Sequence, residues 1–435
     1  MIPQHCTTKY GHKLLVCQTD RFKAGLLTVS AVQPIPHGEA WKTSLLLSVL
    51  RRGCEKYPTL EALNRRLDYL FGTELGIRNF YRGDSQIIGF SADVLNSACL
   101  PEREDLLSEA TDVMRQILFH PLLDGDGLLL ERYVESEKQQ QCDHIRALRN
   151  NPRGYASAQC RSILFENEPC GESLYGREED VMAITPKELT AHWRRLTERL
   201  CLHGFYVGPE PASRVVTAFE NAFGDLPTTP DGGAAHIMSN VVRRAGQMRR
   251  REEQLPVGQS QLVMAFRTDA TIFEDAYYAC SLMNEVLGTS PIAKLFMNLR
   301  ERMSLCYFCS SQYNAYKGTL TVHCGIDQTN REKAEREILA QIRGLAEGNF
   351  SDEELTAAKN SISNAYRQME DSPAAIENFY FGRTLAGIDQ DTATIGRAFA
   401  ELSREDIMRA ARALTLDTVY FLEGTLSGEE DDDVE

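Results

Sequence analysis

The sequence predicts an α+β protein made of two homologous domains, each a mainly antiparallel sheet covered by helices. Its 435 residues, 43% of them hydrophobic, exceed one ordinary core and suit two domains of about 200 residues each. The order strand, helix, helix, hairpin and long helices occurs twice along the chain, although the residues of the two halves differ. This repeated order indicates a duplicated unit.

The first half alternates apolar, β-branched runs with amphipathic ones. A strand is predicted at 26–33, followed by helices at 39–53 and 60–72. Two strands come next, joined at Arg82-Gly83-Asp84, which we interpret as turn residues and not as an adhesion motif. The remaining elements expected here are helices at 101–118, 128–148, 153–164 and from Thr185, where a capping box with Glu188 stands, and a strand at 201–208.

A segment rich in Pro, Gly and Thr divides the halves. It predicts a linker at 225–236, with an N-terminal domain at 1–224 and a C-terminal domain at 237–427. The acidic run that follows, 428–435, predicts a disordered tail. The elements expected in the second half are a linker or edge strand at 243–252, a strand at 261–268, helices at 273–288 and 291–303, a hairpin at 305–326, and helices that begin at Ser351 and Ser403.

Composition excludes several classes of partner. A formal net charge of -15 argues against nucleic acid, because phosphate binding needs a basic face. No apolar stretch approaches the ~20 residues that span a bilayer, and no signal peptide is recognisable. The twelve cysteines stand mostly in apolar surroundings, which favours buried, reduced thiols over disulfides. We therefore expect a soluble, cytoplasmic protein without a membrane partner.

The residues alone reveal no complete catalytic or metal-binding set. The nine histidines stand singly, without an HxxEH or HxxxH pair. The one CxxC, Cys306 to Cys309, lies in a predicted strand, where residues three apart point to opposite faces, so these thiols are expected to diverge. Nucleophile elbows and phosphate-binding loops are also missing from the sequence.

Two stretches resemble the pitrilysin/insulinase metallopeptidases. SLLLSVLRRGCEKYP at 44–58 is similar to the family's zinc helix, HFLEHMLF-x-GT-x-x-YP, and LRERMSLCY at 299–307 is similar to its LRE-x-x-GLAY. The likeness runs from about Thr7 to Leu426 and implies the family's half-shell of two domains. It extends to mitochondrial processing peptidase subunits and to zinc-less bacterial relatives associated with elongation-factor-P modification. The matching positions of the zinc helix are Leu46, Leu50, Gly53, Tyr57 and Pro58.

The resemblance also shows which residues depart from the family. The zinc histidines would fall at Ser44 and Ser48, the catalytic glutamate at Leu47, and the third ligand near His144. Ser hydroxyls stay protonated near neutral pH, and Leu47 cannot take a proton from water, so metal-activated hydrolysis cannot run on this chain alone. We expect no metal, no cofactor and no catalytic residue here, with zinc only in a partner.

The family's substrate-contacting Arg and Tyr correspond to Arg300 and Tyr307. A cation and a phenol can hold a peptide carbonyl, but Arg300 could instead pair with a carboxylate and Tyr307 pack in its strand. We predict a non-catalytic subunit that binds peptide and pairs with an active HxxEH-bearing homologue, as a heterodimer, or else self-associates as a homodimer. The alternatives are a structural scaffold subunit, or a peptidase with an unrecognised site at Cys306 or Cys309.

Overall fold

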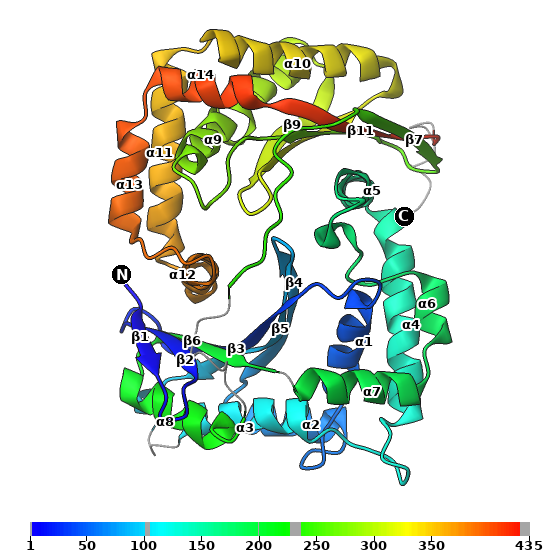
Figure 1. The fold of residues 1–435 in the computed structure, drawn as a ribbon, viewed down its shortest axis with the longest axis vertical. Coiled ribbons are helices and arrows are strands. Elements are labelled where there is room, and N and C mark those ends of the chain that lie inside the picture. The colour runs from blue at the N-terminus through cyan, green and yellow to red at the C-terminus, as the bar shows by residue number, and fades with distance from the viewer. Residues whose placement is uncertain (1, 101–104, 199, 227–235, 427–435) are drawn as a thin grey trace. The chain divides into compact units, whose positions relative to one another are not determined.

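The computed structural model describes residues 2–100, 105–198, 200–226 and 236–426. These form two compact units, each built on one sheet with helices against it (Figure 1). Most of the predicted linker at 225–236 and the acidic tail at 428–435 lie outside the described residues. Unit 1 comprises Met1–Ile145, Glu172–Met238 and Gln368–Asp389, and unit 2 comprises Arg146–Gly171, Ser239–Arg367 and Gln390–Glu435.

The sheet of unit 1 has six strands, and most of their buried residues belong to apolar stretches of the sequence. All neighbouring strands are antiparallel except one parallel pair, β2 with β6. Strand β4 lies at the edge and pairs with β5. In spatial order the strands are β1 (Gln4–Thr7), β2 (Lys13–Gln18), β6 (Leu202–Gly208), β3 (Ala24–Pro34), β5 (Ser85–Leu95) and β4 (Glu74–Arg82).

Several helices of unit 1 begin at a residue whose side chain caps the helix. The Thr185 hydroxyl accepts from Glu188 N while the Glu188 carboxylate accepts from Thr185 N, so the predicted capping box is confirmed. The unit's helices are α1 (Ala40–Leu50), α2 (Leu60–Tyr69), η1 (Ser97–Cys99), α3 (Leu106–Phe119), α4 (Glu131–Ala147), α6 (Glu178–Ala183), α7 (Pro186–Thr197), α8 (Ala212–Phe223) and α12 (Pro373–Leu385).

The sheet of unit 2 repeats five strands of the unit 1 sheet. Its one parallel pair, β7 with β11, corresponds to β2 with β6, and the other neighbours are antiparallel. This confirms the predicted duplication and the α+β fold class. In spatial order the strands are β7 (Arg249–Leu255), β11 (Thr415–Gly424), β8 (Ser260–Arg267), β10 (Thr319–Ile326) and β9 (Cys306–Asn314).

Unit 2 has π-helical turns where a regular helix was expected. Both η4 (Glu285–Thr289) and η5 (Phe296–Arg302) are π-helices; η4 overlaps the end of the helix predicted at 273–288, and η5 lies in the helix predicted at 291–303. Such turns are frequent at functional sites. The other helices of this unit are η2 (Leu148–Asn150), α5 (Pro152–Leu164), η3 (Pro169–Gly171), α9 (Ala276–Asn284), η6 (Gln328–Asn330), α10 (Arg331–Glu347), α11 (Asp352–Met369), α13 (Thr392–Glu401) and α14 (Arg404–Ala413).

Each unit takes one helix from the opposite half of the sequence. Helix α5 packs on β8 and β11 of unit 2, and α12 packs on β3 and β6 of unit 1. The α12 contact includes a buried ion pair of 2.7 Å between Arg78 Nη2 and Glu377 Oε1. The compact units therefore differ from the predicted split at 225–236, because two helices cross over to the other sheet.

Candidate functional site

Helix α1 carries the degenerate zinc motif and is buried nearly all round. Leu45, Leu46 and Leu47 have no solvent exposure, because the helix packs on β4 and β5 and also on α7. The helix ends at Leu50, and the turn that follows reaches Gly53, whose φ is +156° and whose hydrogen faces the Tyr57 carbonyl. A Cβ at this position would lie 2.8 Å from that oxygen, so only glycine fits. The motif residues Gly53 and Tyr57 thus form the turn that follows the helix.

A cavity of about 390 Å³ lies where α1, β4 and α4 meet within unit 1. Three of the four predicted positions, Ser44, Ser48 and His144, line it. The fourth, Leu47, does not, because its side chain lies in the hydrophobic core. The other lining residues are Ile77, Asn79, Glu137, Gln140, Gln141 and Tyr175.

The Ser44 hydroxyl is held by two internal hydrogen bonds. It donates to the Leu174 carbonyl and accepts from Asn79 Nδ2 at 2.6 Å. The Asn79 carbonyl oxygen in turn accepts from Gln86 Nε2 at 2.9 Å. Ser44 is 7% exposed, so these bonds satisfy a polar group that water would not reach well. A position that would carry a metal ligand in the family therefore belongs to a hydrogen-bond network.

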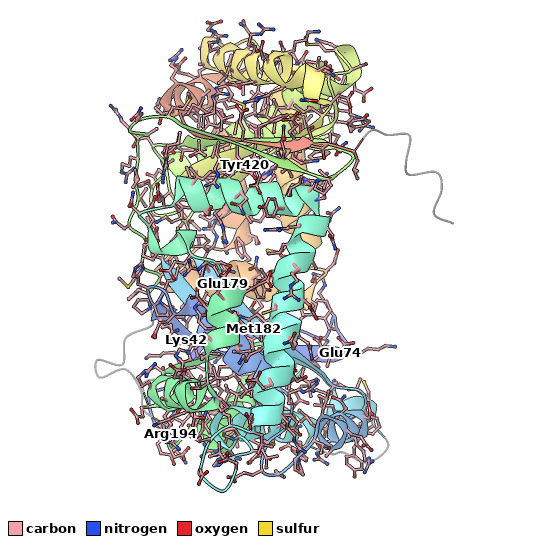
Figure 2. The ribbon with its side chains drawn as sticks, turned by 90° about the vertical axis from the view of Figure 1, so that its right-hand side faces the viewer. Lys42, Glu74, Glu179, Met182, Arg194 and Tyr420 are labelled. Carbon is pink, nitrogen blue, oxygen red and sulfur yellow. The ribbon has the colours of Figure 1, made fainter. Side chains whose placement is uncertain are left out.

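Helix α4 supplies the opposite wall of the cavity. The exposed His144 ring lies against Tyr175, with 4.1 Å between ring centroids, and Gln141 Nε2 donates to the Tyr175 carbonyl at 2.8 Å. In Figure 2, Met182 of α6 lies beside α4, and Gln139 Nε2 is 3.8 Å from Met182 Sδ. The segment at 174–175 is thus fixed to both α1 and α4.

The cavity contains one carboxylate, which is already paired. Glu137 Oε1 lies 3.3 Å from Arg52 Nε, and burial raises the pKa of Glu137 although the Arg52 charge opposes this. Our sequence analysis missed Glu137 and Gln141. A signal was present, because Glu137, Gln141 and His144 follow one another at helical spacing (i, i+4, i+7) on one face of α4.

These donors do not fit a catalytic zinc ion. Such a site needs three nitrogen, sulfur or carboxylate ligands around one open position. Among the described residues that line the cavity, His144 is the only imidazole, the Ser44 hydroxyl is engaged on both sides, and Glu137 is held by Arg52. Hydrolysis by a metal-bound water has no support from the residues of this cavity.

The second predicted pair lies in unit 2 and is exposed. Arg300, on η5, is 49% exposed, and its Nε lies 3.6 Å from Glu301 Oε1. Tyr307, at the start of β9, is 59% exposed and donates to Asp327 Oδ1 at 3.2 Å. The Asp327 charge raises the pKa of Tyr307. Tyr307 therefore does not pack within its strand, and the carboxylate partner of Arg300 among the described residues is its neighbour Glu301.

The expectation that the CxxC thiols diverge is wrong. Strand β9 carries a bulge at Tyr307, because Cys309 pairs with Cys324 whereas Cys306 pairs with Ile326. The extra residue moves Cys306 by one position, so Cys306 and Cys309 share a face. A regular strand would have placed them on opposite faces. No disulfide joins cysteines among the described residues, and most of the twelve are buried, as expected from their surroundings.

A sequence profile and a curated relative point to the same kind of protein. The sequence profile described as "Peptidase M16 inactive domain" matches residues 183–362. A curated relative, "Probable inactive metalloprotease YmfF" of Bacillus subtilis, is 26% identical over 94% of this chain and 95% of that protein. The chain is therefore similar to M16 peptidases along nearly its whole length. It is an inactive-type homologue, which agrees with the loss of the zinc-helix residues at Ser44, Leu47 and Ser48.

Solved structures share the M16 fold along nearly the whole chain. A conserved protein from Enterococcus faecalis superposes with a TM-score of 0.88 at 25% identity, over 99% of this chain and all of that one (100%). An M16 inactive domain from Pseudomonas fluorescens gives a TM-score of 0.79 at 17% identity, over 98% of this chain and 99% of the other. Among the described residues, no helix has the length and apolar character to cross a membrane.

Proposed function

We propose that this M16 homologue is a non-catalytic subunit that binds peptide and completes the site of an active, HxxEH-bearing partner. One observation supports this most directly: Arg300 and Tyr307 are exposed, with partners that water screens, whereas Ser44, at one of the family's zinc positions, is engaged internally. A chain with this distribution can contribute to a reaction centre only where another chain supplies the metal.

The edge of the unit 1 sheet offers a place for the peptide backbone. Within the described part of the chain, β4 pairs with β5 alone, so its outer backbone groups are open to an added strand. Its side chains Ile77, which is 42% exposed, and Asn79 both line the cavity. Glu74 marks the start of this strand in Figure 2. An extended peptide paired with β4 would place alternate side chains toward the cavity.

The exposed pair of unit 2 has the chemistry to act on a peptide carbonyl. A guanidinium and a phenol both donate hydrogen bonds, and such donors are most useful where negative charge develops on a carbonyl oxygen. The Arg300–Glu301 ion pair is solvent-exposed, so exchanging it for a substrate contact costs little. Both side chains lie in one unit, on η5 and at the beginning of β9.

The partner must supply the zinc, because a homodimer would combine two copies of the same ligand-free helix. We therefore favour a heterodimer. The competing function is a scaffold subunit without a role in proteolysis. The two differ in a single requirement: only the first needs a partner chain with the HxxEH motif.

The test is reconstitution with an HxxEH-bearing homologue from the same organism. Hydrolysis of unfolded peptides is measured for each chain alone and for the mixture, with R300A and Y307F in this chain. R302A removes a second exposed arginine of η5, and Y69F alters another exposed tyrosine, so both serve as matched controls. We expect activity only in the mixture, reduced about 10- to 100-fold by R300A or Y307F and unchanged by the controls.

Full activity of the mixture with both R300A and Y307F in this chain would show that Arg300 and Tyr307 do not contribute to the reaction. Stable assembly with chains that lack HxxEH, and no effect on any HxxEH-bearing homologue, would instead favour the scaffold function.

A further inference from the structure

Three cysteines gather on one face of the unit 2 sheet. Cys309 of β9 and Cys324 of β10 are direct cross-strand partners. Cys306 joins their face because the bulge at Tyr307 pairs it with Ile326, two residues beyond Cys324. A regular continuation of the strand would have turned Cys306 to the opposite face. The bulge therefore creates a thiol cluster, defined here as Cys306, Cys309 and Cys324.

The cluster has one accessible member and two sheltered members. Cys309 is 5% exposed and Cys324 is 1% exposed, whereas Cys306 is only partly buried. Hydrogen bonding from the Cys309 and Cys324 thiols lowers the pKa of Cys306, and the positive charge of Arg300 acts in the same direction. The same hydrogen bonding with Cys306 raises the pKa of Cys309. Cys306, the least buried thiol of the cluster, is therefore also the one that ionises most readily.

We propose that the cluster is an oxidisable site, at which Cys306 reacts with a hydroperoxide and a neighbouring thiol of the cluster resolves the product. In the first step the Cys306 sulfur attacks the peroxide, the O–O bond breaks, Cys306 becomes a sulfenic acid, and the peroxide leaves as water or an alcohol. In the second step Cys309 or Cys324 attacks the Cys306 sulfur, a disulfide forms and water leaves. Two thiols are oxidised by two electrons, and the peroxide is reduced by two.

The geometry supports a resolving step without unfolding of the strands. All three side chains occupy adjacent positions of the same two strands, and directly opposed residues have Cα separations of about 4.5–5.5 Å, within the range that disulfides bridge. A reactive cysteine that is accessible, low in pKa and next to a resolving thiol is the arrangement of redox-sensitive sites. Cys99 offers a contrast, since it is exposed but lies in η1, outside the cluster.

The experiment treats the reduced, full-length chain with hydrogen peroxide, follows thiol loss over time and maps the products by mass spectrometry. The wild type should form one intrachain disulfide that joins Cys306 to Cys309 or Cys324. C306S should slow the fast phase at least about 10-fold, and C99S is the matched control that should leave it unchanged. In C309S/C324S, a Cys306 sulfenic acid should persist and be trapped by dimedone. The single variants C309S and C324S serve if the double variant does not fold.

Two results would overturn the proposal. One is oxidation of Cys306 no faster than that of Cys99. The other is stoichiometric binding of copper(I) or zinc through the three thiols, with protection of Cys306 from peroxide, which would make the cluster a metal site instead.

Discussion

The cavity of unit 1 and the Arg300–Tyr307 pair of unit 2 hold polar residues in opposite ways. In the cavity, Ser44 bonds to Leu174 and Asn79 inside the unit, and Glu137 is paired with Arg52. In unit 2, Arg300 and Tyr307 are about half exposed or more, and their partners are at the surface. A network of internal bonds serves stability, whereas exposed donors with screened partners are available to another molecule.

The same contrast exists between the helices of the repeat. Helix α1 is regular and buried, with Leu47 in the core where the family has a glutamate. The corresponding part of the second repeat contains the π-helices η4 and η5, and the exposed Arg300 lies on η5. In the first repeat, Leu47 is part of the hydrophobic core, whereas in the second repeat Arg300 remains exposed at the surface.

Restoring the ligands should recover a metal site. With His144 already at the cavity, S44H and S48H together would provide three imidazoles, two of them at i and i+4 on α1. We expect zinc affinity to rise at least about 10³-fold over the wild type, or about 4 kcal/mol, measured by calorimetry and metal analysis. The control is S44H/S48H/H144A, which should lose most of the gain. Equal binding without His144 would show that α4 does not face the vacated positions.

Acid should destabilise unit 1 more than unit 2. Burial lowers the pKa of His192 and His203 in unit 1, and of His323 in unit 2, from 6.5 to about 4. Because the unfolded chain binds these protons first, stability is lost as pH falls from about 6.5 to about 4, by on the order of 3 kcal/mol per histidine. Hydrogen exchange measured at pH 7 and pH 5 should show earlier opening in unit 1. H192Q should reduce the difference, and uniform opening would contradict the assignment.

Removal of the Ser44 hydroxyl should cost stability rather than activity. S44A removes the Ser44 hydroxyl that bonds to the Leu174 carbonyl and to Asn79 Nδ2, which predicts a loss of about 1–3 kcal/mol in the free energy of unfolding by urea titration. The control is S48A, because Ser48 is only partly buried on the same helix. If S44A and S48A were equally harmless, the network would not hold the cavity in its present form.

Substitution of Arg300 or Tyr307 should reduce the activity of the mixture with the partner but leave the stability of this chain nearly unchanged. R300A and Y307F should each change the free energy of unfolding by less than about 0.5 kcal/mol, because both side chains are exposed and weakly held. A loss above about 1 kcal/mol in the same urea titration would mean that these residues serve the fold, and it would weaken their assignment to substrate contact.

Much of the fold follows from the sequence, because local patterns determine where elements form. The strands, the capping box at Thr185 and the turn at Gly53 are each encoded within a few residues. The bulge at Tyr307 is different, since it is defined by the register against β10 and not by the residues of β9 alone. The crossing of α5 and α12 between units depends on contacts more than a hundred residues apart, which no local pattern reveals.

The candidate site was predictable only in part for a similar reason. Ser44, Ser48 and His144 were reached through the family resemblance, and the structure brings them to one cavity. Asn79 comes from an edge strand and Tyr175 from a loop, so only the folded chain shows that they share this cavity.

We infer from the residues at Ser44, Leu47 and Ser48 that this chain cannot activate water by itself. The most direct measurement combines zinc analysis with hydrolysis of an unfolded peptide, on the purified chain in zinc-containing buffer, with and without a chelator. We expect zinc well below one ion per chain and no cleavage above the buffer rate. One tightly held zinc per chain, lost in S44A/S48A, together with chelator-sensitive cleavage by the lone protein, would contradict it.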